Sequence, residues 1–551
     1  MSTIKVAFLD QTLEIPIDIS LLELSEQAKE YFEEAIVAAK VDNVLKDLNY
    51  RLTEDCHIEF IDLTTDDGFR IYQRSVSFLL LKAVGELFPQ ASVTIEHSIS
   101  KGLYCELHGI DPVTEKDIKE IEKHMWDMVE QDIEFHKDTV PLAEAIKLFE
   151  KEGQLDKVKL LKYRNIPTIN IYSCGWLRDY FYGYMLPSTG YLKHFELKFY
   201  MPGFILRYPD KHNPRVIPEY KEHPKLFNIF REAEKWARIL EVKDVGSLND
   251  QIAAGHGEDL IRTSEAFHEK KIAQLADTIT AARDQVRLIL IAGPSSSGKT
   301  TFAQRLMVQL RVNNVKPISI SLDDYFVSRD KTPLDENGEP DFEALEAIEL
   351  ELFNEQLTKL IQGAEVELPT FNFLTGQREY RGKKIRINRD QPIIIEGIHG
   401  LNEHLTGSIP RGSKFKIYIS ALTQLNIDNH NRIPTTDARI LRRIVRDSQF
   451  RSHDALKTLR IWPKVRRGEE RNIFPFQEDA DVMFNSHLPY ELAVLKRYAE
   501  PLLKAIDQTE PEYSEAKRLL KFLSYFLPLE DFAVANNSII REFIGNSCFS
   551  Q

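Results

Sequence analysis

A short segment rich in glycine and serine, in the middle of the chain, has the residue types that hold phosphate groups. Residues 293–300 read Gly-Pro-Ser-Ser-Ser-Gly-Lys-Thr, after an apolar run at 288–292 and before a helical pattern at 301–306. Glycines let the backbone turn several N–H groups toward one point, and the start of a helix adds positive potential. Lys299 supplies a full charge to the β- and γ-phosphates, and Thr300 would hold Mg²⁺. We predict a nucleotide-binding loop; the alternatives are a Gly/Ser-rich surface loop and a regulatory nucleotide site without catalysis.

Two acidic positions at the ends of later apolar runs would complete a phosphoryl-transfer site. Asp323 and Asp324 follow the strand pattern at 317–322. A carboxylate one strand beyond a phosphate loop lies where it can take the proton of a substrate hydroxyl, so we predict Asp323 as a base. A pair of turn-capping aspartates would leave the same pattern. Glu396 ends the apolar run 392–395, where it would provide a second ligand for magnesium.

The segment 439–471 is strongly basic, with eleven Lys or Arg residues against four Asp or Glu. Its helical pattern predicts a lid that closes over the phosphates and neutralises charge in the transition state. A solvated basic helix and an RNA-facing patch are the alternatives. The whole chain has a net charge of −14, which repels polyanions except at such a local patch.

The rest of the composition indicates a cytoplasmic protein without a membrane segment. The 551 residues are 43% hydrophobic and 28% charged, and no apolar run approaches the roughly 20 residues that cross a bilayer. The first ten residues lack the pattern of an export signal. The four cysteines are scattered without a C-x-x-C pair, which favours buried thiols over disulfides or zinc.

Residues 286–505 resemble the uridine kinase and phosphoribulokinase family of P-loop kinases. The matching motifs are the phosphate loop, the strand followed by Asp-Asp-Tyr-Phe at 323–326, Leu-Pro-Thr-Phe-Asn-Phe at 368–373, Ile-Glu-Gly at 395–397 and Arg-Arg-Ile-Val-Arg-Asp at 442–447. The resemblance implies an α/β domain with a mostly parallel sheet. It also implies an enzyme that uses ATP and Mg²⁺ to phosphorylate an alcohol, with a nucleoside 5′-hydroxyl as the expected acceptor.

The same resemblance implies roles for individual residues. Catalysis would involve Lys299, Asp323 and Arg446. Thr300 and Glu396 would hold the metal. The nucleotide would be bound by Gly293, Ser295, Ser296, Ser297, Gly298, Lys299, Thr300, Thr301 and Arg451. The acceptor would be bound by Asp323, Tyr325, Glu343, Phe371, Phe373 and Arg446.

Two departures from the family pattern concern the acceptor. Uridine kinases usually carry a histidine that reads the pyrimidine edge where this chain has Gly376, and the lid glutamine that also reads the base falls near Ile461. A missing hydrogen-bond partner weakens discrimination substantially. The acceptor therefore stays open between uridine, another nucleoside and a small molecule that is not a nucleoside.

The N-terminal half resembles the front of threonyl-tRNA synthetases, namely their small TGS domain and their second, editing-type domain. Editing there uses an H-x-x-x-H pair and a C-x-x-x-H pair, which align to Arg74 with Phe78 and to Cys174 with Arg178. One ligand of four cannot hold a metal or organise hydrolysis. We therefore expect a binding or regulatory module, with tRNA or another ligand as its partner.

Pattern and resemblance together predict a multidomain α+β and α/β chain of five units. These are a TGS-like domain (1–65), a module like the synthetase second domain (66–209), a helical linker (210–285), a uridine kinase-like P-loop domain (286–505) and a C-terminal helical extension (506–551). The main hypothesis is an ATP-dependent nucleoside kinase with a regulatory N-terminal half. An RNA-binding protein with an ATP-sensing loop is the alternative. A GTPase is disfavoured because no N-K-x-D element is found. The oligomeric state stays open.

Overall fold

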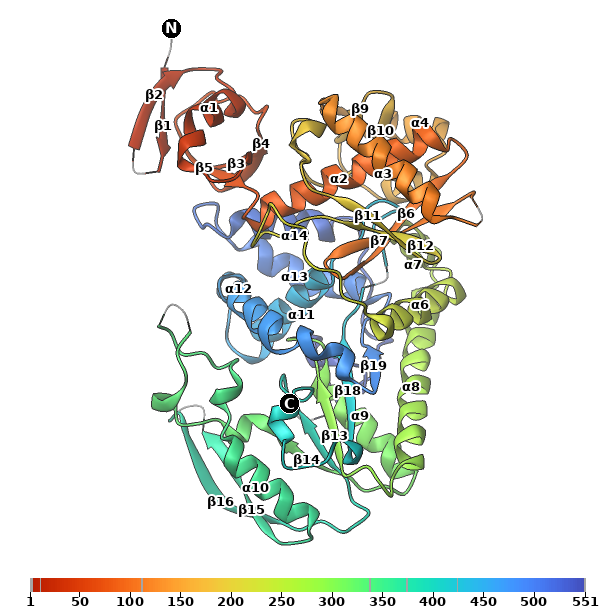
Figure 1. The fold of residues 1–551 in the computed structure, drawn as a ribbon, viewed down its shortest axis with the longest axis vertical. Coiled ribbons are helices and arrows are strands. Elements are labelled where there is room, and N and C mark those ends of the chain that lie inside the picture. Colours follow the sequence, from red (N-terminus) through yellow and green to blue (C-terminus); the bar gives the residue numbers. More distant parts are fainter. Residues whose placement is uncertain are drawn as a thin grey trace.

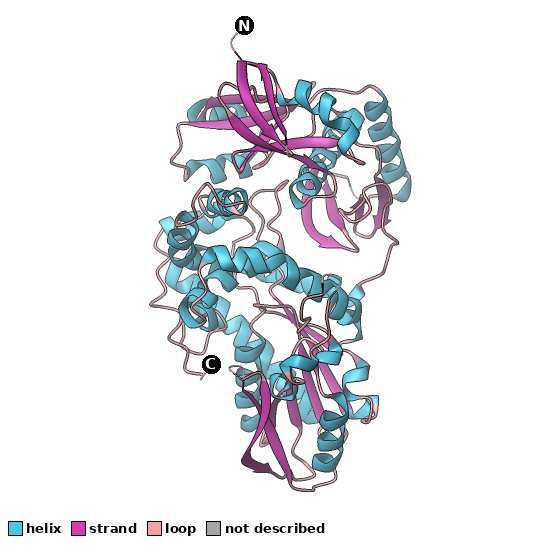
Figure 2. Cartoon of the chain, turned by 90° about the vertical axis from the view of Figure 1, so that its left-hand side faces the viewer, coloured by secondary structure: helices cyan, strands magenta, loops and turns pink. Residues whose placement is uncertain are grey.

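The computed structural model describes residues 3–9, 11–110, 112–335, 338–372, 375–423 and 425–549. Figure 1 shows two N-terminal units at one end of an elongated molecule, a central helical region, and a parallel sheet at the other end. The view in Figure 2 shows the same order, with helices between the outer groups of strands. No helix among these residues has the length and apolar character needed to span a membrane.

The first unit is a five-stranded sheet, in the order β2-β1-β5-β3-β4, that packs against one helix. Its strands are β1 (Thr3–Phe8), β2 (Gln11–Pro16), β3 (Ile36–Val41), β4 (Val44–Asp47) and β5 (Cys56–Asp62), and its helix is α1 (Leu21–Ala28). Ser20 and Glu23 begin α1 with a capping box, in which each side chain accepts a hydrogen bond from the other residue's backbone N–H. Alternate residues of β1 are buried beneath this helix.

The second unit contains two antiparallel sheets and the long helix α2 (Asp66–Leu87). One sheet has the order β11-β12-β7-β6, from β6 (Ser92–Ile99), β7 (Gly102–His108), β11 (Glu196–Tyr200) and β12 (Gly203–Arg207). The other has the order β10-β9-β8, from β8 (His136–Pro141), β9 (Thr168–Cys174) and β10 (Leu177–Asp179). The remaining helices are α3 (Glu115–Glu130), α4 (Leu142–Lys151) and α5 (Leu155–Lys162).

Three helices lead from this unit to the parallel sheet of the C-terminal half. They are α6 (Pro224–Ile239), α7 (Val245–Ala253) and α8 (Gly257–Ala281). The start of α7 joins the two halves, because the Val245 N–H donates to the Asn426 carbonyl and the Asn426 side chain donates to the Ile95 carbonyl. The end of α8 packs against α9, beside the phosphate loop.

The sheet that carries the predicted catalytic residues has five parallel strands in the order β14-β17-β13-β18-β19. Their bounds are β13 (Leu288–Ala292), β14 (Ile318–Ser321), β17 (Ile393–Glu396), β18 (Lys414–Ser420) and β19 (Val482–Asn485). The central strand β13 is wholly buried. Ile289 and Ile291 pack on one face with α8 and α9, while Leu288 and Leu290 pack on the other with α10. Burial on both faces explains why the run is apolar without alternation. The predicted α+β and α/β fold class is confirmed.

Helices and a hairpin surround this sheet. The helices are α9 (Lys299–Val312), α10 (Leu350–Ile361), α11 (Thr435–Phe450), α12 (Ala455–Asn472) and α13 (Glu491–Lys504). The hairpin comprises β15 (Val366–Asn372) and β16 (Gln377–Ile385). After α13, α14 (Tyr513–Leu523) packs against α13, and the short α15 (Arg541–Ile544) lies on α11. The C-terminal extension therefore returns to the catalytic half.

Candidate active site

The phosphate loop lies between the buried strand β13 and the first turn of α9. Gly298 is the residue before α9 and has a φ of 84°, in the left-handed region that favours glycine. The Lys299 ammonium folds back over the loop and donates to the carbonyls of Gly293 (2.9 Å) and Pro294 (3.1 Å). Burial lowers the pKa of Lys299, against the raising influence of Glu396 and Glu542. The loop therefore presents backbone N–H groups and one ammonium at the same edge of the sheet.

Thr300 and Glu396 meet where β13 and β17 end. The strands pair in parallel, with Ile291 beside Glu396, and the Thr300 hydroxyl donates to the Glu396 carboxylate over 3.0 Å. The pKa of Glu396 is raised to about 7, chiefly by burial; Glu542 and Asp323 contribute to the rise, while Lys299 and Thr300 oppose it. A hydroxyl and a carboxylate are oxygen donors of the kind that Mg²⁺ takes, so these two residues fit that ion.

Asp323 and Asp324 follow β14, which is the neighbour of β17. Burial and the charge of Asp324 raise the pKa of Asp323, while Lys299 and Arg451 lower it. A raised pKa suits a carboxylate that accepts a proton near neutral pH. The Asp324 carboxylate instead accepts a hydrogen bond from the Phe371 N–H (3.1 Å), which links the β15–β16 hairpin to the end of β14. The Asp324 carboxylate thus contacts the hairpin, and Asp323 stays the predicted base of the pair.

Two of the residues expected to bind the acceptor, Tyr325 and Phe371, pack against other aromatic side chains. The Tyr325 ring lies in the core against Phe353, and its hydroxyl donates to Gln356 over 2.7 Å, so it offers no surface to an acceptor. Phe371 packs edge-on against Phe326, with ring centroids 5.7 Å apart. Phe373 lies outside the described residues.

Glu343 lies beneath the lid, where its side chain packs against Gly468 of α12. Burial and Glu469 raise the pKa of Glu343 to about 7, while Arg443 and Lys299 oppose the shift. At the two altered positions, Gly376 has a φ of 69° and packs on Arg329, and Ile461 is a half-buried residue of α12. Neither Gly376 nor Ile461 has a side chain that could form a hydrogen bond with a base.

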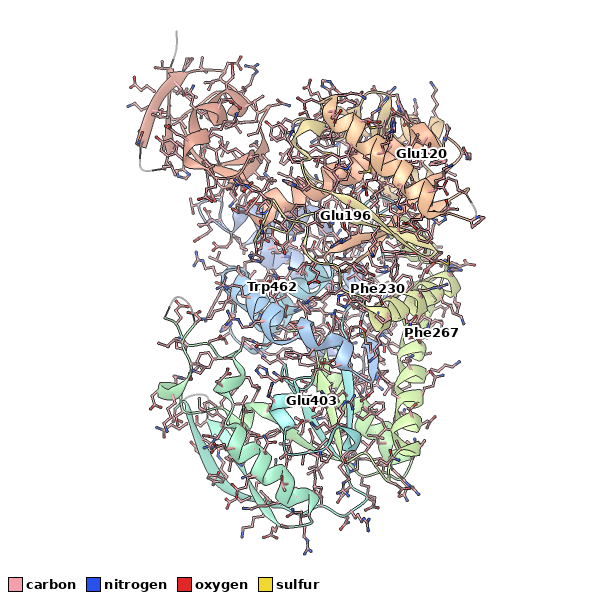
Figure 3. All side chains as sticks on the ribbon, viewed as in Figure 1. Glu120, Glu196, Phe230, Phe267, Glu403 and Trp462 are labelled. Carbon is pink, nitrogen blue, oxygen red and sulfur yellow. The ribbon has the colours of Figure 1, made fainter. Side chains whose placement is uncertain are left out.

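Helix α11 holds the phosphate loop through arginines whose role the sequence did not reveal. Arg439 donates to the Ser295 carbonyl (2.9 Å), Arg442 to the Ser296 carbonyl (3.2 Å) and Arg443 to the Ser295 hydroxyl (2.7 Å). Arg439 also pairs with Glu469, and its guanidinium lies 5.4 Å from the ring centroid of Trp462, which is labelled on α12 in Figure 3. Spacings of three and four residues place these arginines on one helical face, which was the available signal.

The buried carboxylate of Asp447 pairs with Arg446 and Arg451, which were predicted to contact phosphates, and also with Arg443. This fully buried carboxylate pairs with Arg446 (2.8 Å), Arg443 (3.1 Å) and Arg451 (3.7 Å). The charge of Arg451 also lowers the pKa of Asp323, the predicted base. One carboxylate thus holds three cations at the mouth of the phosphate loop.

The positions aligned with the editing pairs form no metal site. Phe78 is fully buried against Phe135 and Phe181, and burial raises the pKa of the Cys174 thiol to about 11. Arg74 donates to the Tyr184 carbonyl over 2.7 Å. No group of three or more His, Cys, Asp or Glu side chains that could hold a metal ion occurs among the described residues.

Comparisons with known proteins confirm both predicted resemblances. Residues 288–491 match the family described as Phosphoribulokinase / Uridine kinase family. The N-terminal half is similar to threonine–tRNA ligases. The chain is 33% identical over 183 residues to the ligase of Alkalilimnicola ehrlichii, covering 33% of this chain and 28% of that protein. It is 30% identical over 253 residues to the ligase of Citrifermentans bemidjiense, covering 44% of this chain and 39% of that protein.

The chain thus spans less than half the length of either ligase. A solved structure described as a possible uridine kinase from Bacillus stearothermophilus is 22% identical to this chain. The structural match covers 39% of this chain and 98% of the kinase chain, with a TM-score of 0.27.

Proposed function

We propose that the catalytic half transfers the γ-phosphate of ATP to the hydroxyl of a small molecule, with a nucleoside 5′-hydroxyl as the favoured acceptor. The observation that carries this proposal is the meeting of three strand ends. Lys299 and Thr300 follow β13, Glu396 ends β17 within 3.0 Å of Thr300, and Asp323 follows β14 on the next strand. The match of residues 288–491 to a kinase family supports the same reaction.

In the proposed reaction, the loop N–H groups and Lys299 bind the phosphates while Thr300 and Glu396 hold Mg²⁺. The bound ion would offset negative charge on the β- and γ-phosphate oxygens. Asp323 accepts the hydroxyl proton as the acceptor oxygen bonds to the γ-phosphorus. The bond from that phosphorus to the bridging oxygen breaks, and ADP leaves. Arg446 and Arg451 neutralise charge on the transferred group.

The acceptor pocket would lie between the hairpin and the lid. Glu343 would accept hydrogen bonds from acceptor hydroxyls, and Phe371 would give the hairpin side an apolar surface. Because Gly376 and Ile461 offer no polar side chain, a pyrimidine edge would be read poorly here. The proposal therefore names a nucleoside as a class, with a non-nucleoside alcohol as its alternative.

ADP release across nucleosides, sugars and ribulose 5-phosphate, with and without tRNA, tests the proposal. We expect at least one hydroxyl compound to raise ADP release well above the rate without acceptor. Lys299→Ala should reduce that rate by at least about a hundredfold, because the transition state loses its main positive charge. Lys316→Ala, at an exposed lysine after α9, is the matched control and should retain full activity.

Equal rates in Lys299→Ala and wild type would refute the catalytic assignment. We likewise propose that the five residue ranges given above are the domains of the chain. The N-terminal half would be a binding or regulatory module.

RNA binding is a second candidate, favoured by the synthetase similarity of the N-terminal half. The charges of α12 disfavour an RNA-binding patch there, because Arg466, Arg460 and Lys464 each pair with two carboxylates. Binding of tRNA that weakens steeply with salt would support this candidate. Binding that is absent at low salt would remove it.

A further inference from the structure

Two carboxylates of the chain accept hydrogen bonds from backbone N–H groups of the phosphate loop and of the helix turn that follows it. Glu542, in α15, accepts a hydrogen bond from the Thr301 N–H (3.2 Å) and another from the Thr301 hydroxyl (2.9 Å). Glu469, in α12, accepts the Ser295 N–H at the other end of the loop (2.8 Å). Thr301 lies in the first turn of α9, where backbone N–H groups lack partners within the helix. These donors are the ones that a phosphate would use.

Glu542 also lies among the charges of the catalytic site. Its carboxylate raises the pKa of both Glu396 and Lys299. A phosphate group placed on the Thr301 N–H would have to displace this carboxylate, since both are anions competing for the same donors. Any phosphate nearby would also be repelled by its charge. In this arrangement Glu542 takes the place of a ligand.

Packing holds the segment around Glu542 against the loop. Ile539 and Phe543 are fully buried with Phe302 of α9, and Ile539 lies so close to Gly298 that a side chain at that position would collide with it. Arg541 donates to Asp531 over 2.7 Å. The segment is therefore built into the flank of the loop.

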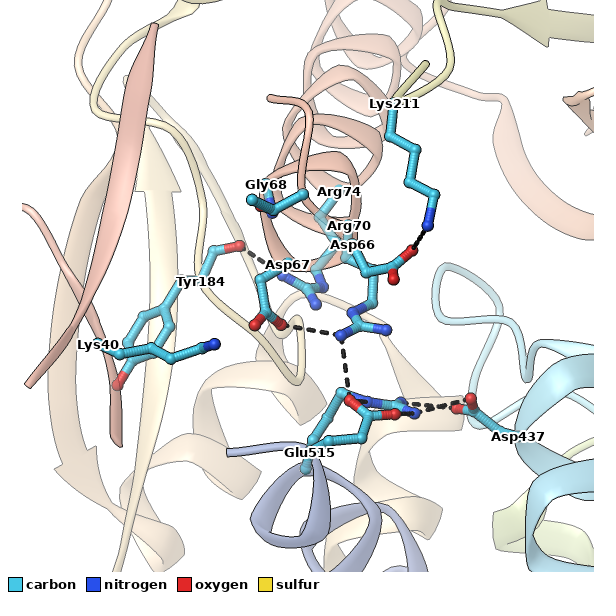
Figure 4. Close-up of polar contacts among 12 residues, drawn as sticks. Lys40, Asp66, Asp67, Gly68, Arg70, Arg74, Tyr184, Lys211, Asp437 and Glu515 are labelled. Carbon is cyan, nitrogen blue, oxygen red and sulfur yellow. Dashed lines mark hydrogen bonds and ion pairs between the residues drawn. The ribbon is translucent and has the colours of Figure 1, made fainter. Parts of the chain in front are cut away.

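The same C-terminal extension is tied to the N-terminal half. Figure 4 shows Arg70 of α2 between Asp67 and Glu515 of α14. The distances from Arg70 to Asp67 and Glu515 are 2.9 and 3.1 Å. Arg518 of α14 pairs with Glu515 and also with Asp437 of α11 (2.7 Å to each). One extension thus contacts the synthetase-like half, the lid and the phosphate loop.

We propose that residues 538–545 are an autoinhibitory segment, in which Glu542 occupies a phosphate position until nucleotide displaces it. The ion pair between Arg70 and Glu515 connects the N-terminal half to the extension that carries Glu542. A ligand bound to the N-terminal half would therefore change the affinity for ATP. The inference rests on the proposed function only in taking the loop as the ATP site.

Calorimetric titration of ATP with Mg²⁺ into the full chain tests the proposal. Glu542→Gln removes the competing charge while keeping the size of the side chain. We expect the Kd for ATP to fall at least about tenfold, since hydrogen bonds to a charged group are among the stronger ones in proteins. Glu530→Gln is the matched control, because Glu530 lies in the same extension, is exposed and pairs with Arg497. Its Kd should equal that of wild type.

Hydrogen exchange of the unmodified chain gives a second measurement that needs no variant. Saturating ATP should speed exchange of the amides at 538–545 if the segment is displaced. Slower exchange there, or an unchanged or higher Kd in a folded Glu542→Gln protein, would overturn the proposal.

The outcome also separates the two proposals. If wild type binds ATP and releases ADP while Glu542→Gln gains no affinity, this inference alone fails. If neither protein binds ATP, the proposed function fails with it.

Discussion

Around Lys299, acidic side chains keep their protons more readily than carboxylates in water. The pKa values of Glu343 and Glu396 are raised to about 7, and that of Asp323 is raised as well. Burial is the first cause in each case, and neighbouring carboxylates add to it. Such a site gains from added positive charge, which a divalent cation would supply.

Asp323→Asn should remove the proton acceptor while keeping the shape of the side chain. We expect kcat to fall by about a hundredfold to ten-thousandfold, with little change in the KM for ATP, because the asparagine cannot take the hydroxyl proton. Steady-state kinetics with the best acceptor measure both. The matched control is Asp324→Asn, whose amide oxygen can still accept the Phe371 N–H. It should lose less than about tenfold. A larger loss in Asp324→Asn than in Asp323→Asn would reverse the two roles.

Local motifs revealed some site residues and could not reveal others. Lys299 and Thr300 belong to a contiguous pattern, and Glu396 ends an apolar run, so the sequence alone pointed to them. Glu469 and Glu542 reach the loop from positions 174 and 241 residues away in sequence from their hydrogen-bond partners. A single glutamate on a helix has no spacing that distinguishes a loop contact from a solvated face. Tyr325 shows the converse, since its position in a motif did not place its side chain in the site.

At the scale of elements, α14 joins parts that the sequence left unconnected. Its periodic apolar residues predicted a helix, but periodicity gives the buried face and not the partner. The structure places that face on α13 and the charged side toward α2. The strands of the catalytic sheet were easier to predict, because a run buried on both faces is apolar throughout.

The ion pairs of Glu515 predict an acid-sensitive contact between α14 and α2. Arg518 and Arg70 outweigh burial and lower the pKa of Glu515 to about 2, from an ordinary value of 4.5. Because the folded value lies below the unfolded one, this stabilisation is complete above about pH 4.5 and is lost as the pH falls toward 2. Glu515→Gln should cost up to about 3 kcal/mol at pH 7, and less at pH 3.

Urea unfolding at pH 7, 5, 4 and 3 measures this difference. Glu26→Gln is the control, since Glu26 is exposed and pairs with the exposed Lys29. A gap between Glu515→Gln and wild type that stays constant down to pH 3 would contradict the assignment.

Over the whole molecule, the two halves share one of their large apolar clusters. A single apolar cluster runs from Phe149 and Leu160 in the synthetase-like half to Leu441, Leu492 and Phe522 in the catalytic half. Buried charges cross the same boundary, because Lys157 of α5 contacts Asp179 of β10 (3.1 Å) and Asp428 before α11 (3.0 Å). The resemblances predicted separate units, and two separate family patterns contain no information about a surface they share.

Lys157→Met should therefore destabilise both halves together. Removing the ammonium takes the Lys157 charge away from the buried Asp179 and Asp428, which costs about 3–5 kcal/mol in comparable buried pairs. Chemical unfolding followed by fluorescence measures the loss, and ATP binding should disappear in the same transition. Lys162→Met, at an exposed lysine paired with Asp250, should change stability by less than about 0.5 kcal/mol. A Lys157→Met protein as stable as wild type would show that the halves are energetically independent.

The burial of Ile539 and Phe543 beside the phosphate loop has a consequence for biosynthesis. These side chains complete the core around α9, yet they are translated about 240 residues after the phosphate loop. The central strand β13 likewise cannot pair with its neighbours β17 and β18 until they are translated, about a hundred residues later. We therefore expect the core around α9 to become fully packed only after residues 538–545 have been translated.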